Sequence, residues 1–185
     1  MTDRESLRQL LLERSVERGD FVLASGRRSS FYVDCRRTTM SAQGMALIGR
    51  MGWSAIQRFG WQPAVVGGLT MGADPVACAI AVASVGSAHP VNAFSVRKQA
   101  KDHGTGRLIE GNFRAGDAVV VVEDVITSGE SASRALSTVE QAGGRVLGVL
   151  AVVDREEGGR RSLEAQGRTV VALITVSELG LRETP

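Results

Sequence analysis

The sequence predicts an α/β fold in which a central, mainly parallel sheet is flanked by helices. The first observation is Val119–Val122, a run of four β-branched residues typical of a strand buried on both faces. The second is that such strands alternate with stretches of helical apolar spacing, which is the pattern of parallel sheets. The third is glycine, at 22 of 185 residues. This content is about 12% against a usual 7% or so, which favours many tight loops.

The elements can be placed in order along the chain. Thr2 and Glu5 form a capping box before an N-terminal helix that carries Leu7, Leu10 and Leu11 on one face. Gly143 and Gly144 end the helix that follows the valine strand. The other predicted elements are strands over 21–23 and 31–34, a helix over 41–59, a strand over 64–67, a helix over 75–85, strands over 91–96, 118–122 and 146–153, a short helix around Leu163 and a strand over 170–174.

Bulk properties limit the class of protein. At 185 residues the chain fits one domain over 1–185, large enough to bury a sizeable core. A net charge of +2 argues against wholesale nucleic-acid or membrane binding. Two cysteines suit a reducing compartment, and no apolar run reaches the roughly 18 residues of a membrane span. The acidic N-terminus has no secretory signal. We therefore expect a cytoplasmic protein that binds neither nucleic acid nor membrane.

Two carboxylates stand at the end of the valine strand. Glu123 and Asp124 follow it, and Thr127, Ser128 and Gly129 can form a tight turn whose N–H groups open onto the next helix. Active sites of open α/β sheets lie at this end of the strands, and such a turn can hold a phosphate. The pattern suits a sugar phosphate, although a buried strand with an acidic helix cap would look similar. A Walker B strand is excluded because no G-x-x-x-x-G-K-[ST] loop is present. A receiver domain would carry its acidic pair near the N-terminus.

Between residues 97 and 110 the apolar periodicity of helices and strands disappears, and charged residues predominate. Arg97, Lys98, Lys101 and His103 lie within a few positions of one another, and Gly104, Gly106 and Gly111 bound the stretch. A long loop with glycine hinges after a buried strand is typical of an active-site lid. A solvated basic surface loop is the alternative interpretation.

Several motifs resemble those of a known enzyme family. The stretch 119–131 resembles the phosphoribosyl-pyrophosphate (PRPP) motif of type I phosphoribosyltransferases. R-K-x-x-K-D-H-G over 97–104 is similar to the catalytic loop of orotate phosphoribosyltransferases. The stretch 21–34 resembles that family's N-terminal motif, 67–75 its pyrophosphate loop, and Asp154-Arg155 the position of an arginine that meets the orotate carboxylate. The resemblance covers about residues 5–180.

The resemblance implies a fold, a reaction and partners. The fold is the type I phosphoribosyltransferase fold, with a small N-terminal hood contributed by about 1–40 and the C-terminal segment, and a mobile catalytic loop over about 97–111. The reaction transfers the 5-phosphoribosyl group of PRPP to orotate N1, giving orotidine 5-monophosphate and pyrophosphate in pyrimidine (UMP) biosynthesis. Mg²⁺ is carried in by PRPP without a dedicated protein site. A homodimer with shared active sites is also implied.

The resemblance also implies roles for individual residues. The catalytic set is Lys101, Asp124, His103 and Arg97. The PRPP-binding set is Arg97, Lys98, Lys101, His103, Glu123, Asp124, Val125, Ile126, Thr127, Ser128, Gly129, Glu130 and Ser131. The orotate-binding set is Tyr32, Thr127 and Arg155, and the pyrophosphate loop is Leu69, Thr70, Met71 and Gly72.

Three positions depart from the family's pattern. Ala24 and Met71 stand where several members carry lysine, and Glu123 stands where Asp is common. We expect backbone amides, Mg²⁺ and the mobile loop to carry more of the pyrophosphate charge here. Two alternative functions are a phosphoribosyltransferase for another base and a non-catalytic PRPP-binding regulator. The loop sequence and Arg155 favour orotate, and the basic face or added DNA-binding segment of such a regulator is absent from the sequence.

Overall fold

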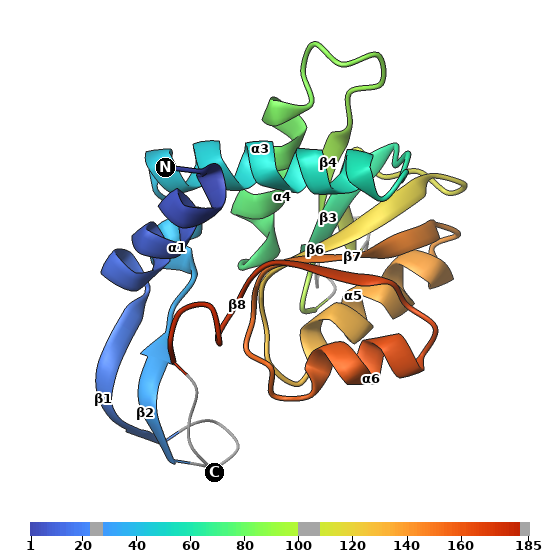
Figure 1. Cartoon of the computed structure of the whole chain (residues 1–185). Coiled ribbons are helices and arrows are strands. Elements are labelled where there is room, and N and C mark those ends of the chain that lie inside the picture. The colour runs from blue at the N-terminus through green and yellow to red at the C-terminus, as the bar shows by residue number, and fades with distance from the viewer. Residues whose placement is uncertain (23–27, 100–107, 182–185) are drawn as a thin grey trace.

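The computed structural model describes residues 1–22, 28–99 and 108–181, and a six-stranded sheet lies at its centre (Figure 1). The strands lie in the order β5-β4-β3-β6-β7-β8. β5 is antiparallel to β4, and the other neighbouring strands are parallel. The predicted α/β class with a mainly parallel sheet is confirmed. The strands are β3 (Val65–Leu69), β4 (Asn92–Val96), β5 (Ile109–Gly111), β6 (Ala118–Ile126), β7 (Arg145–Asp154) and β8 (Val170–Thr175).

Helices cover both faces of the sheet. α3 (Ala42–Arg58) and α4 (Ala73–Ala83) lie on one face, and α5 (Glu130–Gln141) and α6 (Gly159–Ala165) lie on the other (Figure 1). Val120 and Val122 pack with α3 and α4, whereas Val119 and Val121 pack with α5. All four valines are fully buried. Each contributes roughly 1.5–3 kcal/mol by burial, so β6 anchors the two halves of the core.

The N-terminal residues form a separate layer beside the sheet. α1 (Asp3–Arg14) has the predicted capping box: Thr2 N donates to Glu5 Oε2 at 2.8 Å, and Glu5 N donates to Thr2 Oγ1 at 3.3 Å. A two-stranded antiparallel sheet of β1 (Val16–Val22) and β2 (Arg28–Val33) follows. Residues 176–181 pack against α1, where Arg4 Nη2 lies 2.7 Å from Glu178 Oε1. The two ends of the described chain therefore meet on one side of the sheet.

β6 runs further than the sequence indicates. The predicted end at Val122 is wrong, because the strand continues through Glu123 and Asp124 to Ile126. The continuation is held by β7, whose Val153 pairs with Val125. β3 pairs with β6 only as far as Gly67 with Val121. Both acids therefore lie in the part of β6 that extends past its pairing with β3 and is still paired with β7.

Two described elements lie where no regular structure was predicted. β5 occupies residues assigned to the loop over 97–111, because Ile109 pairs with Val96 in β4. α2 (Arg36–Thr39) is a single turn without apolar periodicity, and Thr38 Oγ1 lies 2.7 Å from Ser15 Oγ beneath it. Both elements depend on contacts with segments distant in the sequence, so no local sequence pattern predicts them.

Other bounds differ by a few residues. α4 begins at Ala73 rather than at Pro75, since proline fits the first turn of a helix. β1 begins at Val16 and β2 at Arg28, so the hairpin extends beyond the predicted strands over 21–23 and 31–34. α5 ends close to the predicted glycines, and Gly143 has a φ of 85°. Within the described residues no helix has the length and apolar character needed to cross a membrane.

Candidate active site

A cleft of about 290 Å³ opens at the carboxyl ends of β3 and β6. Residues of the β2 region, the loop after β3, the end of β6 and the start of α5 border it. This is the edge of the sheet at which the sequence predicted a site. The lining residues are Tyr32, Val33, Asp34, Cys35, Arg36, Leu69, Thr70, Met71, Gly72, Lys98, Glu123, Asp124, Val125 and Ser131.

The two acids of β6 differ in environment. Glu123 is 4% exposed, and its Oε1 has no hydrogen-bond partner among the described residues. Burial, with the charge of Asp124 adding, raises the pKa of Glu123 to about 8. Burial also raises the pKa of Asp124, but the N–H of Val125 donates to its Oδ1 at 2.9 Å and opposes this shift. Burial therefore favours the protonated form of both acids, and the Val125 N–H favours the ionised form of Asp124.

The turn after β6 is built around Gly129. Its φ of 82° is left-handed, and it is the N-cap residue of α5. Gly159 packs against the turn, because its N–H donates to Thr127 O at 2.9 Å and a Cβ there would lie 2.4 Å from that oxygen. Thr127, Ser128 and Ser131 remain exposed. Hydroxyl groups and the N-terminus of α5 are therefore open to an anion at this turn.

The loop after β3 lies directly against Asp124. A Cβ at Gly72 would stand 2.5 Å from Asp124 Oδ1, so only glycine permits this approach. Thr70 Oγ1 donates to Asp74 Oδ2 at 2.7 Å, and Ser95 Oγ donates to Asp74 Oδ1 at 2.5 Å. All four residues predicted for the pyrophosphate loop, Leu69 to Gly72, line the cleft.

The two residues predicted to meet orotate differ in position. Tyr32 lines the cleft, is 39% exposed, and has its ring centroid 5.8 Å from that of Phe21. Arg155 is 6% exposed and does not line the cleft; its Cζ lies 5.0 Å from the ring centroid of Phe31. Arg155 Nε is 2.8 Å from Glu157 Oε1, but its N–H is not aimed at that oxygen, so the contact is an ion pair rather than a hydrogen bond. The Arg155 side chain therefore contacts Phe31 and Glu157 rather than the cleft.

The basic stretch after β4 is described only at its two ends. Lys98 lines the cleft, whereas Arg97 lies outside it with Nη1 3.8 Å from Glu110 Oε1. Lys101 and His103 lie outside the described residues, as does Ala24. Of the predicted basic residues, the structure therefore brings Lys98 to the cleft.

Four residues that line the cleft had no predicted role: Val33, Asp34, Cys35 and Arg36. Arg36 Nε donates to Asp34 Oδ1 at 2.8 Å, and Arg36 Nη2 donates to Asp34 Oδ2 at 3.1 Å. Burial raises the pKa of the Cys35 thiol well above its usual range, so this cysteine is not a thiolate nucleophile. The available signal was their position, since Val33 and Asp34 end the motif over 21–34 and Cys35 and Arg36 follow it directly.

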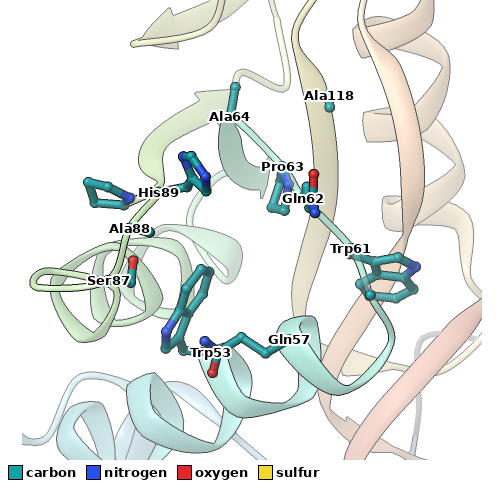
Figure 2. A pocket seen from close by; sticks show the side chains of 12 residues that line it. Trp53, Gln57, Trp61, Gln62, Pro63, Ala64, Ser87, Ala88, His89 and Ala118 are labelled. Carbon is teal, nitrogen blue, oxygen red and sulfur yellow. The ribbon is translucent and has the colours of Figure 1, made fainter.

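A larger cavity, about 670 Å³, lies at the opposite edge of the sheet, where β3, β4 and β6 begin. Figure 2 shows it between α3, the turn before β3 and the turn before β4, with Trp53, Gln57 and His89 among the side chains that border it. Its lining contains no Asp, Glu, Lys or Arg. The cavity thus lacks the charges that a phosphorylated substrate requires, and the smaller cleft is the candidate active site.

Relatives with known names share this sequence over nearly its whole length. The orotate phosphoribosyltransferase of Mycobacterium avium is 48% identical over 177 residues, covering 96% of each chain. The chain belongs to the orotate phosphoribosyltransferase family. A second member, from Aquifex aeolicus, is 43% identical over 182 residues, covering 97% of this chain and 98% of the relative. No protein-family model matches the chain.

A solved structure of an orotate phosphoribosyltransferase has the same fold. The Mycobacterium tuberculosis enzyme in complex with PRPP matches with a TM-score of 0.82 and 41% identity, covering 97% of this chain and all of that one. The resemblance inferred from the motifs is thereby confirmed, as is the type I phosphoribosyltransferase fold. Membership of the orotate phosphoribosyltransferase family also argues against a regulator or an enzyme for another base.

Proposed function

We propose that this chain transfers the 5-phosphoribosyl group of PRPP to N1 of orotate, giving orotidine 5-monophosphate and pyrophosphate for UMP biosynthesis in the cytoplasm. One observation carries the proposal: Glu123, Asp124 and the loop Leu69–Gly72 border one cleft that reaches the start of α5. A ribose that bears a 5-phosphate and a 1-diphosphate requires carboxyl groups for its hydroxyls, an open helix N-terminus for the phosphate and a further loop for the diphosphate. Cys35 and Cys78 are both free thiols, which suits a reducing compartment.

The proposed mechanism relies on positioning and charge. The ribose 2- and 3-hydroxyls donate to Asp124 and Glu123, and the 5-phosphate binds the turn Thr127–Ser131. Bond breaking at C1 builds positive charge on the ribose ring, and the nearby carboxylate of Asp124 stabilises that charge. Pyrophosphate departs toward Leu69–Gly72, Lys98 and the loop residues Arg97, Lys101 and His103. Holding both reactants in line supplies much of the rate enhancement.

Mg²⁺ fits the donors of this cleft. This hard ion usually binds one or two carboxylates together with substrate phosphates and water. The carboxylate of Asp124 is the protein group in the cleft that would hold it, and no cluster of three potential metal ligands occurs among the described residues. Bound together with PRPP, Mg²⁺ would supply positive charge beside the departing pyrophosphate. We therefore propose that Mg²⁺ arrives with the substrate.

The base site involves the hairpin side of the cleft. Tyr32 offers an exposed ring on which a planar base can stack, and Arg155 offers a fixed guanidinium for its carboxylate. For this contact orotate has to share Arg155 with Glu157, which lies 2.8 Å from it. We propose that the hood of residues 1–40 and the C-terminal segment covers the base in this position.

We also propose a homodimer with shared active sites. α4 and the residues next to its two ends present an exposed apolar face: Met71 before the helix is 57% exposed, Val82 within it 73% and Val85 after it 76%, and Cys78 is exposed between them. Cys78 and Val82, both within α4, are four positions apart and therefore lie on one side of the helix. Met71 also lines the cleft. A second copy seated on this face would therefore lie at the edge of the active site, where it can contribute its loop.

The reaction can be tested with six bases. Ultraviolet absorbance would follow orotate, hypoxanthine, guanine, adenine, uracil and nicotinate separately, each with PRPP and Mg²⁺. We expect consumption of orotate alone, dependent on the metal and reversed by added pyrophosphate. Turnover of a different base would contradict the base assignment, and no turnover with any base would contradict the enzyme.

A further inference from the structure

We propose that Arg36 is a further substrate-binding residue, whose guanidinium contacts the diphosphate of PRPP. The inference rests on the proposed function, since it assigns a new contact to the same cleft. Arg36 begins α2, and two residues separate it from the end of β2, the strand that carries Tyr32. It lines the cleft together with Met71, Gly72 and Lys98.

Asp34 holds the guanidinium in one orientation. Arg36 Nε and Nη2 donate to the two oxygens of Asp34 at 2.8 and 3.1 Å, and the Arg36 N–H donates to Asp34 Oδ1 at 3.2 Å. A guanidinium has five N–H donors, so three remain after the two to Asp34. The Arg36 side chain is 48% exposed, which leaves these donors accessible to a ligand. A fixed, planar cation of this kind is well suited to phosphate oxygens.

The charge balance of the cleft supports a role for this cation. Asp34, Glu123 and Asp124 put three carboxyl groups on its wall, whereas Arg36 and Lys98 are the cationic side chains among its described lining residues. The loop Leu69–Gly72 contributes no cationic side chain. Asp34 chiefly, with Tyr32 and Asp124 adding, raises the pKa of Arg36. Without Arg36 the diphosphate would face the acids with Lys98 alone on the described wall.

Arg36 adjoins two parts of the substrate site, and the ligand has to be distinguished. Arg36 follows the segment that carries Tyr32, which is proposed to stack on orotate. The orotate carboxylate is therefore the other anion that Arg36 has to be tested against. The diphosphate is favoured because Arg36 and the whole loop Leu69–Gly72 border the same space, while Arg155 supplies a cation beside the hairpin.

Calorimetric binding of two ligands separates these possibilities. PRPP carries the diphosphate, whereas ribose 5-phosphate has the same hydroxyls and 5-phosphate without it. We expect Arg36→Ala to weaken PRPP binding about 10- to 100-fold, the loss of one charge-assisted hydrogen bond, and to leave ribose 5-phosphate within about twofold. Arg36→Lys should recover part of the loss. Arg37→Ala is the matched control, since Arg37 pairs with Glu17 and does not line the cleft.

Removal of Arg36 also leaves Asp34 without its partner, which a double variant addresses. Asp34→Asn/Arg36→Ala should bind PRPP as weakly as Arg36→Ala; restored binding would mean that repulsion by Asp34 caused the loss, and would overturn the proposal. Equal weakening of both ligands, or weakening of orotate binding instead, would also overturn it. If the wild-type chain fails to bind PRPP, the proposed function falls as well, whereas wild-type binding unaffected by Arg36→Ala overturns this inference alone.

Discussion

Asp74 accepts a hydrogen bond from the hydroxyl of Thr70 at 2.7 Å, and thereby fixes the loop after β3. Its other oxygen accepts from Ser95 at the end of β4. Arg97 and Lys98 follow two and three residues later. One carboxylate therefore ties together the two segments that are proposed to receive pyrophosphate.

Replacing Asp74 should disturb PRPP binding more than it disturbs the fold. Asp74→Ala removes two hydrogen bonds to a charged group, so we expect the KM for PRPP to rise roughly tenfold and the free energy of unfolding to fall by about 1–3 kcal/mol. Steady-state kinetics and urea unfolding would measure both. Glu164→Ala, at the exposed ion pair with Arg160, should leave the KM for PRPP unchanged and alter the free energy of unfolding by no more than about 0.5 kcal/mol. An unchanged KM for PRPP would show that the loop does not need Asp74.

Gly72→Ala should abolish most activity. The added Cβ would stand 2.5 Å from Asp124 Oδ1, so either the loop or the catalytic carboxylate has to move. Displacement of about 1 Å in a reacting site can cost on the order of 10²-fold in rate. Gly19→Ala is a suitable comparison, because its Cβ would approach only the Phe21 ring, at 3.4 Å. Wild-type kcat in Gly72→Ala would contradict the close packing of loop and acid.

Stability should fall as the pH rises toward 8, through Glu123. Its pKa is about 8 in the folded chain against an ordinary value of 4.5, so the folded state binds the extra proton between these values. The stabilisation is complete below about pH 4.5 and is lost progressively up to about pH 8. Its size is on the order of a few kcal/mol. Urea unfolding at pH 6 and 8 would detect it, and Glu123→Gln, which mimics the protonated acid, should reduce the difference between the two pH values.

Shared active sites predict recovery of activity from two inactive chains. Lys101→Ala should lower kcat on the order of 10²-fold, like the loss of one preorganised donor, and Asp124→Asn should be at least as impaired. After subunit exchange a mixture should regain activity, because some dimers then contain one intact site. Mixing Lys101→Ala with itself is the control. Absence of recovery despite demonstrated exchange would indicate self-contained sites.

The strand, the acids and the turn could be predicted because each leaves a local pattern. Val119–Val122 marks a strand buried on both faces, and the acids follow at the edge where parallel sheets bind ligands. Tyr32 and the loop Leu69–Gly72 were also recognisable, through motifs that follow one another in family order. Lys101 and His103 stay predictions from those motifs, since they lie outside the described residues.

Arg36 and Asp74 could not be predicted in the same way. Arg36 belongs to a one-turn helix without apolar spacing, and its orientation comes from Asp34 and from the packing of α2 against α1 and α3. Asp74 is an ordinary first-turn residue of α4 until folding brings Ser95 to it from 21 positions away. The extra length of β6 likewise comes from pairing with β7. Each feature depends on contacts between segments that a linear pattern does not join.

The most direct test of the central claim is release of pyrophosphate from PRPP in the presence of orotate, compared between the wild-type chain and Asp124→Asn. We predict that the wild-type chain forms pyrophosphate and orotidine 5-monophosphate in equal amounts, and that Asp124→Asn, with unchanged thermal stability, loses most of this turnover. Equal turnover by both chains would contradict the assignment of the reaction to the cleft at the end of β6.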